Sequence, residues 1–285
     1  MKLLWNTNKN INSFWGNYHF LNSSSWIYSI LNQIDYKKLD SVEQVNEKDD
    51  LIIIDSQLTA KKNFYLQLSK KCSSIYLIHL GDEGATEDTN SIYNNCTHVW
   101  RTFCLPYYYQ SNKVTCIPIG YKSGLTYEIK DVFDREYLWS FMGTIHGASR
   151  YDLINKHKKL QPNFIKETKN FSSAESLSAE EYYKKLKESI FVLVPHGYLH
   201  PESYRLYEGL ECGCIPIIEN PHNFYDNFLP DNPLIKINLW NESIDIINDL
   251  NKNKNKLKKK FEEINIWWKH YKLNLQNTIK TKIHV

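Results

Sequence analysis

One segment of the chain combines side chains suited to binding an anion with backbone features that would position them. An apolar run at 190–194 is followed by Gly197 and Pro201, and then Ser203 stands where a helix N-cap belongs. The free N–H groups at the start of a helix favour a diphosphate. Arg205, one turn into the helix, can add a charge-assisted hydrogen bond. The segment therefore predicts an anion-binding loop between a strand and a helix.

Glu208 lies further along the same predicted helix. A carboxylate accepts hydrogen bonds from two hydroxyl groups, so Glu208 suits the 2′- and 3′-hydroxyls of a ribose. Arg205 and Glu208 are spaced i and i+3, however, and can instead pair with each other on the helix surface. The spacing alone leaves both interpretations open.

A second candidate loop follows the apolar run Leu138–Met142 and precedes a helical pattern at Asp152–Leu160. Gly143 and Gly147 allow close approach of the backbone to a ligand, and Arg150 can reach a phosphate or a base. Ligands of open α/β sheets bind at the carboxyl ends of the strands. Both loops are therefore expected to contribute to ligand binding.

The first half of the chain places two carboxylates directly after an apolar run. Ile75–Leu80 leads into Asp82 and Glu83, which stand between two glycines. This position predicts an exposed loop whose carboxylate can take a proton from an attacking hydroxyl. Asp82 is the first choice for that base, Glu83 the second and His79 the third. The alternative is that Asp82 caps the next helix or turn.

Short β-rich runs alternate with longer amphipathic stretches, the pattern of parallel sheets with crossover helices. The expected strands are Leu51–Ile54, Ile75–Leu80, His98–Arg101, Val114–Ile119, Leu138–Met142, Ile190–Val194, Cys214–Ile218 and Leu234–Ile237. The expected helices are Ala60–Lys71, Glu180–Glu188 and Ser203–Glu211.

A chain of 285 residues has room for two α/β domains. We expect an N-terminal domain over 1–122, a second domain over 123–265 and a C-terminal helix over 266–285, with Gly120–Arg135 as the linker. The helix either crosses back to the first domain or docks locally. It carries three aromatic side chains that need a packing surface, Trp267, Trp268 and Tyr271.

The chemistry-bearing segments resemble the exostosin-like glycosyltransferases. Their donor domain carries Pro-Glu-Ser/Thr-x-Arg-x-x-Glu-Ala/Gly-Leu and then Gly-Cys-x-Pro-Ile-Ile, matched here by Pro201–Leu210 and Gly213–Ile218. The Gly143 loop with Arg150 and the segment His79–Glu83 occupy corresponding places. The resemblance implies a GT-B-type α/β fold, in which two Rossmann-like domains with parallel sheets face a central cleft and the C-terminal domain holds the nucleotide.

The resemblance also implies which side chains bind each substrate. The donor-binding residues are Gly143, Arg150, His196, Gly197, Glu202, Ser203, Tyr204, Arg205 and Glu208, and the acceptor-binding residues are Trp100, Arg101 and Tyr121. We expect an inverting enzyme that moves a sugar from a UDP-sugar, UDP-xylose first, to a hydroxyl of an oligosaccharide or glycoconjugate, with Asp82 as the base. The rival is an inactive carbohydrate- or nucleotide-binding module of the same fold. A nucleotide-dependent dehydrogenase would carry Gly-x-Gly-x-x-Gly after its first strand, and the chain has none.

Several absences narrow the expectation further. The chain contains no Asp-x-Asp, so we expect neither a metal nor any cofactor besides the donor, with arginines meeting the charge of the leaving group. A net charge of +3 spread along the chain does not indicate a nucleic-acid partner. The sequence shows no signal peptide and no apolar run long enough for a membrane span. We expect six reduced cysteines and a cytoplasmic enzyme, of a type found in microbes and large DNA viruses.

Overall fold

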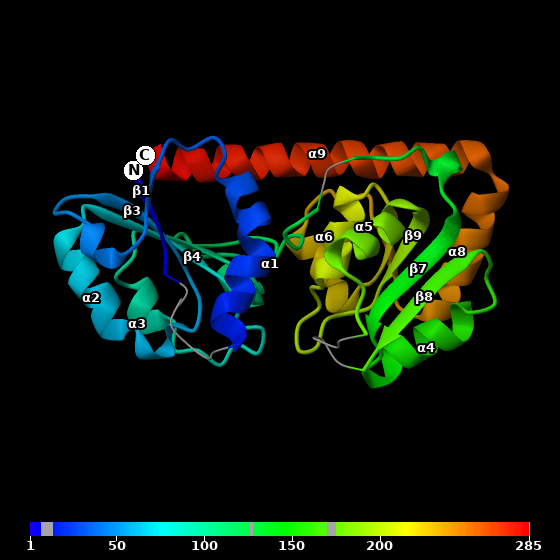
Figure 1. Ribbon diagram of the computed structural model, residues 1–285, viewed down its shortest axis with the longest axis horizontal. Helices are drawn as coiled ribbons and strands as arrows, with labels where there is room; N and C mark the ends of the chain where they lie inside the picture. The colour runs from blue at the N-terminus through cyan, green and yellow to red at the C-terminus, as the bar shows by residue number, and fades with distance from the viewer. Residues whose placement is uncertain (7–13, 126–127, 170–174, 285) are drawn as a thin grey trace. The chain divides into compact units, whose positions relative to one another are not determined.

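The computed structural model describes residues 1–6, 14–125, 128–169 and 175–284 (Figure 1). The chain divides into two compact units. Unit 1 consists of residues 1–119 together with 275–285, and unit 2 consists of residues 120–274. The boundary lies at the start of the expected linker, so residues 120–135 fold with unit 2. No helix within these ranges is long and apolar enough to cross a membrane.

Unit 1 is built on a six-stranded sheet in which each strand pairs in parallel with its neighbours. The order is β2-β1-β3-β4-β5-β6. The strands are β1 (Lys2–Trp5), β2 (Lys37–Leu39), β3 (Asp50–Asp55), β4 (Ser74–His79), β5 (His98–Arg101) and β6 (Val114–Cys116), and the helices are α1 (Phe14–Ile30), α2 (Lys62–Lys71) and α3 (Asn90–Tyr93). Residues 51–54 of β3 are all completely buried, so both faces of this strand are covered.

Unit 2 has a five-stranded parallel sheet in the order β11-β10-β9-β7-β8. Its strands are β7 (Tyr137–Thr144), β8 (Asn163–Thr168), β9 (Ser189–Val194), β10 (Ile215–Glu219) and β11 (Ile235–Ile237). Its helices are α4 (Gly147–His157), α5 (Ala179–Lys187), α6 (Tyr204–Glu211), α7 (Phe224–Phe228) and α8 (Trp240–Lys252), followed by α9 (Lys254–His284).

The eight strands expected from the sequence are all present, with ends that differ by at most three residues. Three strands were not anticipated, namely β1, β2 and β8. Both β2 and β8 lie at sheet edges, and β8 is half-buried over most of its length. Edge strands of this kind carry a weak hydrophobic pattern, which is why the sequence did not reveal these two. β1 lies inside its sheet, but it has only four residues.

The C-terminal helix α9 is longer than the expected helix over 266–285 and contributes side chains to both units. In unit 2, Trp268 donates a hydrogen bond to Glu211 at 2.8 Å, and Lys272 contacts the same carboxylate. In unit 1, Gln276 donates to the carbonyl of Ser29 at 3.0 Å. Fixed polar contacts therefore anchor both parts of the helix.

The expectation of six reduced cysteines is wrong. Cys104, which follows β5, forms a disulfide with Cys116, the last residue of β6. The pairing of β5 with β6 brings them together: Arg101 lies opposite Cys116 in the register, and the Cα atoms of the two cysteines are 5.2 Å apart. Spacing along the sequence carries no sign of this contact. Cys212 and Cys214 are buried thiols, as expected.

Removing this disulfide is expected to destabilise unit 1. The bond closes a loop with a sequence separation of 12 residues, and closing a loop of that size stabilises a fold by roughly 3 kcal/mol through the unfolded state. The double variant Cys104→Ser/Cys116→Ser should lose about that much free energy of unfolding in urea titrations. The control is Cys72→Ser at a half-buried free cysteine, and an equal loss in both variants would contradict the prediction.

Candidate active site

In unit 2 the direction of chain progression reverses between two neighbouring strands. β7 pairs with β9 on one side and with β8 on the other, and β10 continues beyond β9. The loops after β7 and β9 therefore leave the sheet side by side and in opposite directions. Such switch points are where open α/β sheets bind ligands, outside the carboxyl ends of the strands. Both predicted donor-binding loops lie here.

Arg205 reaches from the first turn of α6 to the end of β7. Its Nη2 donates to the carbonyl of Met142 at 2.8 Å, and the guanidinium lies 4.6 Å from the centre of the Phe141 ring. A Cβ atom on Gly143 would approach Nη2 to 2.7 Å. Gly143 also has φ +143°, a backbone conformation that favours glycine, and its role in admitting a ligand stays a prediction.

Arg150 forms hydrogen bonds to both the loop after β7 and the loop after β9. From α4 it donates through Nη1 to the carbonyl of Thr144 at 2.8 Å and through Nη2 to the carbonyl of His196 at 3.1 Å. The imidazole Nδ1 of His196 is in turn 2.8 Å from the carbonyl of Gly197. The structure therefore brings Gly143, Arg150, His196 and Arg205 into one neighbourhood, as the sequence predicted for a donor site.

Glu208 has one carboxylate oxygen satisfied and the other not. The residue is 2% exposed, and its Oε2 accepts a hydrogen bond from the hydroxyl of Tyr182 at 2.6 Å. Burial, and then the charge of Glu208, raise the pKa of Tyr182 well above its ordinary value, so this hydroxyl keeps its proton. The buried Oε1 has no hydrogen-bond partner among the described residues. A buried acceptor of this kind is costly unless a ligand donor completes it.

Arg205 and Glu208 form no ion pair with each other within the described ranges, since each is held by a different partner. The interpretation in which they pair on the helix surface is therefore wrong. Gly209 follows Glu208 on the same helix. It allows α6 to pack directly on β9, because a Cβ atom at this position would collide with Val192. Helix α6 is consequently buried along residues 205–211.

Three other predicted donor residues lie at the start of α6 or directly before it. Ser203 occupies the N-cap position, but its side chain makes no capping hydrogen bond, which corrects that expectation. Glu202 is 1% exposed and accepts a hydrogen bond from the hydroxyl of Tyr207, which fixes the loop on α6. The ring centre of Tyr204 lies 5.8 Å from the ammonium of Lys122. A direct role of these three residues in donor binding stays a prediction.

The carboxyl edge of the sheet in unit 1 also gathers polar side chains. Asp55 lies opposite His79 in the register of β3 and β4, and His79 lies opposite Arg101 in that of β4 and β5. All three are almost completely buried. His79 is 2.7 Å from the hydroxyl of Tyr93 through Nδ1 and 3.3 Å from the carboxylate of Glu87 through Nε2. The third choice for the base is therefore enclosed by protein groups.

Asp82 is not the exposed, ligand-facing side chain that its flanking glycines suggested. Its side chain is 2% exposed, and Oδ2 lies 2.9 Å from Nη2 of Arg101. The other oxygen, Oδ1, accepts backbone N–H groups of Thr86 at 2.7 Å and of Glu87 at 3.2 Å. Asp82 thus caps the following turn, which was the alternative interpretation, and it also forms a buried ion pair that the sequence did not predict. Glu83, beside it, is half-buried.

The predicted acceptor-binding residues are packed inside the protein. Trp100 is completely buried against Tyr76, and Arg101 is 1% exposed. Tyr121 is 7% exposed and belongs to unit 2 rather than unit 1. Burial leaves these side chains little surface for an acceptor, so their exposure gives that assignment no support.

A sequence model of the family described as "RXYLT1 C-terminal domain" matches residues 125–284, more than half of the chain. The chain belongs to this family. Membership confirms the expected assignment to an exostosin-like glycosyltransferase family, and the protein is a glycosyltransferase. A search of curated protein sequences finds no match.

Solved structures support the same fold. T4 phage β-glucosyltransferase is 14% identical with a TM-score of 0.52, and the match covers 100% of both chains. An α1,3-fucosyltransferase is 13% identical with a TM-score of 0.54, over 100% of this chain and 90% of the other. The pneumococcal O-GlcNAc transferase GtfA is 11% identical with a TM-score of 0.51, over 85% of this chain and 57% of the other. The likeness confirms the GT-B fold of this family member.

Sequence reasoning missed Glu219 and Ser149 at the switch point of this glycosyltransferase. Glu219 is the last residue of β10. Its carboxylate accepts hydrogen bonds from the hydroxyl of Ser149 at 2.7 Å and from the backbone N–H of His196 at 3.3 Å. The signal was an acidic residue directly after the buried run 215–218. These contacts fix the start of α4 beside the loop that follows β9.

The described histidine, cysteine and acidic side chains do not form a metal site. Across the described part of the chain, no group of three His, Cys, Asp or Glu side chains is placed to hold a metal ion. His146, which follows β7, instead packs edge-on against Tyr198 with ring centres 5.4 Å apart. Burial, followed by repulsion from Arg150, lowers the pKa of His146. The cationic groups gathered at the carboxyl edge of this sheet are arginines.

Proposed function

We propose that the protein transfers a sugar from a UDP-sugar to a hydroxyl of a glycan or glycoconjugate with inversion at the anomeric carbon, and without a metal ion. The observation that carries the proposal is the switch point of unit 2. There the guanidinium of Arg205, which donates to Met142, and the carboxylate of Glu208, whose Oε1 has no partner among the described residues, lie one turn apart on the same helix. A diphosphate and a ribose have complementary chemistry at that spacing.

Arg205 has further N–H donors that can bind the leaving group. Within the described ranges it spends one N–H on Met142, and a guanidinium has five. As the bond from the anomeric carbon to the diphosphate breaks, negative charge grows on the UDP oxygens. Fixed cationic donors are most effective against charge that develops in the transition state. Arg205 supplies this stabilisation, and Arg150 holds the two loops in place around it.

The attacking hydroxyl must lose its proton to a base. In the proposed mechanism a carboxylate from the loop after β4, residues 82–87, takes that proton. Asp82 has both oxygens engaged by Arg101, Thr86 and Glu87. It is therefore better placed to hold the loop than to accept a proton, and its neighbours on the loop become the stronger candidates.

UDP-xylose is the first donor to test. The family that matches the chain is xylosyltransferase-like, and the solved structure of the T4 phage enzyme is described with UDP-glucose as its substrate. Uridine is therefore the favoured nucleotide. The donor can be tested before the acceptor is known, because transferases hydrolyse their donors slowly when water takes the place of the acceptor.

Release of UDP from a panel of UDP-sugars, without any acceptor, tests the proposal. The panel contains UDP-xylose, UDP-GlcNAc, UDP-glucuronic acid and UDP-glucose. One donor should release UDP faster than the enzyme-free control, and the product sugar should carry the inverted anomeric configuration by NMR. Binding of UDP with no release from any donor would instead support the inactive binding module. No binding of UDP would remove the proposal.

Donor hydrolysis is expected to survive EDTA, because protein groups rather than a metal meet the leaving-group charge. Activity in 5–10 mM EDTA should stay within about twofold of the untreated rate, an effect of at most roughly 0.4 kcal/mol on the barrier. T4 phage β-glucosyltransferase has been crystallised with UDP and Mn²⁺, so Mn²⁺ is the ion to add back. Complete loss with EDTA that Mn²⁺ restores would show that the reaction needs a metal.

A further inference from the structure

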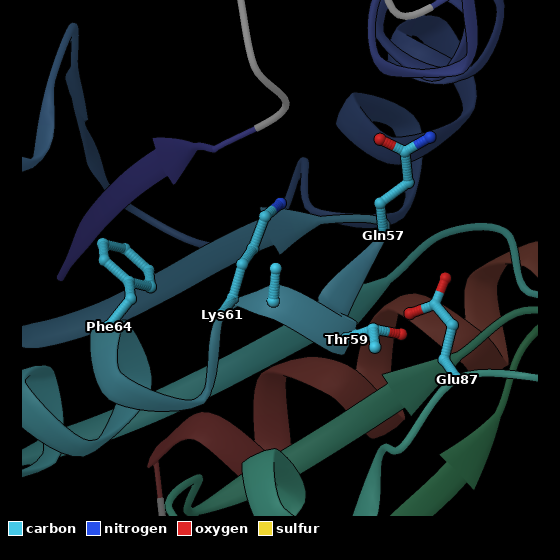
Figure 2. A pocket seen from close by; sticks show the side chains of 6 residues that line it. Gln57, Thr59, Lys61, Phe64 and Glu87 are labelled. Atoms are coloured by element: carbon cyan, nitrogen blue, oxygen red, sulfur yellow. The ribbon is translucent and has the colours of Figure 1, made fainter.

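Unit 1 contains an open pocket that is lined by Glu87, from the loop of residues 82–87, and by residues not yet discussed as substrate contacts. It has a volume of about 640 Å³ and is lined by Gln57, Thr59, Ala60, Lys61, Phe64 and Glu87 (Figure 2). Residues 57–64 follow β3 and run into α2, and Glu87 follows β4. The pocket therefore lies at the carboxyl edge of the sheet.

The position of the pocket in the topology favours ligand binding. β1 pairs with β2 on one side and with β3 on the other, so the chain reverses direction between β1 and β3. This is the switch point of unit 1, equivalent to the one between β7 and β9 in unit 2. A hydrogen bond of 2.9 Å from Asn6, directly after β1, to Asp55, the last residue of β3, joins the two strand ends. Loops at such a point are the usual place for a ligand.

Glu87 presents an ionised carboxylate to this pocket. Its Oε2 accepts the backbone N–H of Leu58 at 2.6 Å and lies 3.3 Å from Nε2 of His79. Within the described ranges Oε1 has no partner. Burial alone would raise the pKa of Glu87, but His79, the Leu58 amide and Arg101 outweigh it and hold the pKa below its ordinary value. One oxygen is thus oriented by the protein, and the other remains to accept a hydrogen bond from a ligand.

The charge of the pocket disfavours an anion. Among the described residues that line it, the only cationic side chain is Lys61, whose ammonium lies 2.5 Å from Oδ1 of the buried Asp55 and also donates to the carbonyl of Ser56 at 2.7 Å. Asp55 neutralises Lys61, so the charge of Glu87 is left in excess over this described lining. A phosphate would meet that carboxylate with no free cation from these residues to offset it.

The remaining lining suits a sugar or another polyol. Thr59 is exposed and offers a hydroxyl group, and Phe64 is half-buried with a ring that lines the same space. Figure 2 shows these side chains around the opening together with Glu87. Carbohydrates are recognised by this combination of groups: a carboxylate accepts hydrogen bonds from the sugar hydroxyls, and an aromatic ring packs on the C–H groups of the sugar.

We propose that this pocket binds a neutral, polyhydroxylated part of the acceptor, with Oε1 of Glu87 accepting a hydrogen bond from one of its hydroxyls. The inference rests on the proposed function, because a binding site for a hydroxyl-bearing acceptor has a purpose only if the protein transfers a sugar. It assigns acceptor recognition to residues 57–64 and 87 in place of Trp100, Arg101 and Tyr121.

Saturation-transfer NMR with two neutral probes, methyl β-D-xylopyranoside and methyl β-D-galactopyranoside, tests this inference, with inorganic phosphate as the competitor. At least one glycoside should bind the full-length protein, and phosphate should not displace it. Glu87→Gln, which keeps the acceptor for the Leu58 N–H, should weaken glycoside binding at least tenfold. Phe64→Leu should weaken it as well.

The matched control is Asp88→Asn, which neutralises the exposed carboxylate next to Glu87 outside the pocket lining, and it should leave glycoside binding within twofold of the wild type. Binding of UDP, measured by calorimetry, should be unchanged in all three variants, and its absence would contradict the proposed function rather than this inference. The inference is overturned if neither glycoside binds, if phosphate displaces it, or if Glu87→Gln and Phe64→Leu both bind it like the wild type.

Discussion

Asp82→Asn is expected to lower the free energy of unfolding by about 3–5 kcal/mol, the cost of removing one partner from a buried ion pair. The side chains of Asp82 and Arg101 are only 2% and 1% exposed, so water cannot replace the lost carboxylate. Turnover should fall with stability, because Asp82 also holds the backbone of Thr86 and Glu87. Urea titration and the UDP-release assay measure the two effects on the same samples.

The double variant Asp82→Asn/Arg101→Gln separates a structural role from a catalytic one. It removes both charges at once, so much of the lost stability should return. We expect activity to return with it. If the fold recovers while turnover stays down by about 10²–10⁴, Asp82 is the general base after all. Glu83→Gln is measured alongside, since it removes the adjacent carboxylate without disturbing the ion pair: a loss of turnover with unchanged stability in that variant would assign the base to Glu83.

Arg205→Ala is expected to weaken UDP binding by roughly 2–3 kcal/mol, or about 30- to 150-fold, through loss of a charge-assisted hydrogen bond to the diphosphate. Pyrophosphate should be weakened by a similar factor, because the arginine recognises the anion. Calorimetry with both ligands measures the losses. Arg205→Lys keeps the charge but not the planar fork, so it should recover only part of the affinity. An unchanged affinity for both ligands in Arg205→Ala would contradict the assignment.

Glu208→Gln should weaken UDP about tenfold and leave pyrophosphate within twofold, since its free oxygen is assigned to the ribose. The amide keeps an acceptor for the hydroxyl of Tyr182, which avoids a second unsatisfied group. Tyr182→Phe is the matched control: it removes the partner of Oε2 but leaves the charge, and should affect UDP far less. Equal losses for UDP and pyrophosphate in Glu208→Gln would remove the ribose role.

Periodicity was sufficient to predict eight of the eleven described strands. Runs such as Leu51–Ile54 and Ile190–Val194 are apolar on every residue, because strands covered on both faces bury nearly every side chain. The donor motif was equally visible, since Arg205, Glu208 and Gly209 lie on one short helix whose geometry follows from local spacing. Local hydrogen bonding determines such elements, and the sequence of a segment is therefore enough to predict them.

Partners distant in the chain could not be predicted in this way. Arg101 follows Asp82 by 19 residues, and their ion pair exists because β4 and β5 are neighbours in the sheet. The disulfide between Cys104 and Cys116 depends in the same way on the pairing of β5 with β6. The flanking glycines predicted an exposed Asp82. Burial, however, depends on which parts of the rest of the chain pack around a residue.

By itself, the sequence determined the class of fold, the strands that carry the sites and the glycosyltransferase family. These follow from hydrophobic period and from a motif confined to one strand, loop and helix. The tertiary structure alone decided that Asp82 is a buried partner of Arg101, that Glu208 keeps one oxygen unpaired and that Glu87 lines an open pocket. The physical reason is that burial and pairing of charges depend on contacts between strands and loops that are far apart in the sequence.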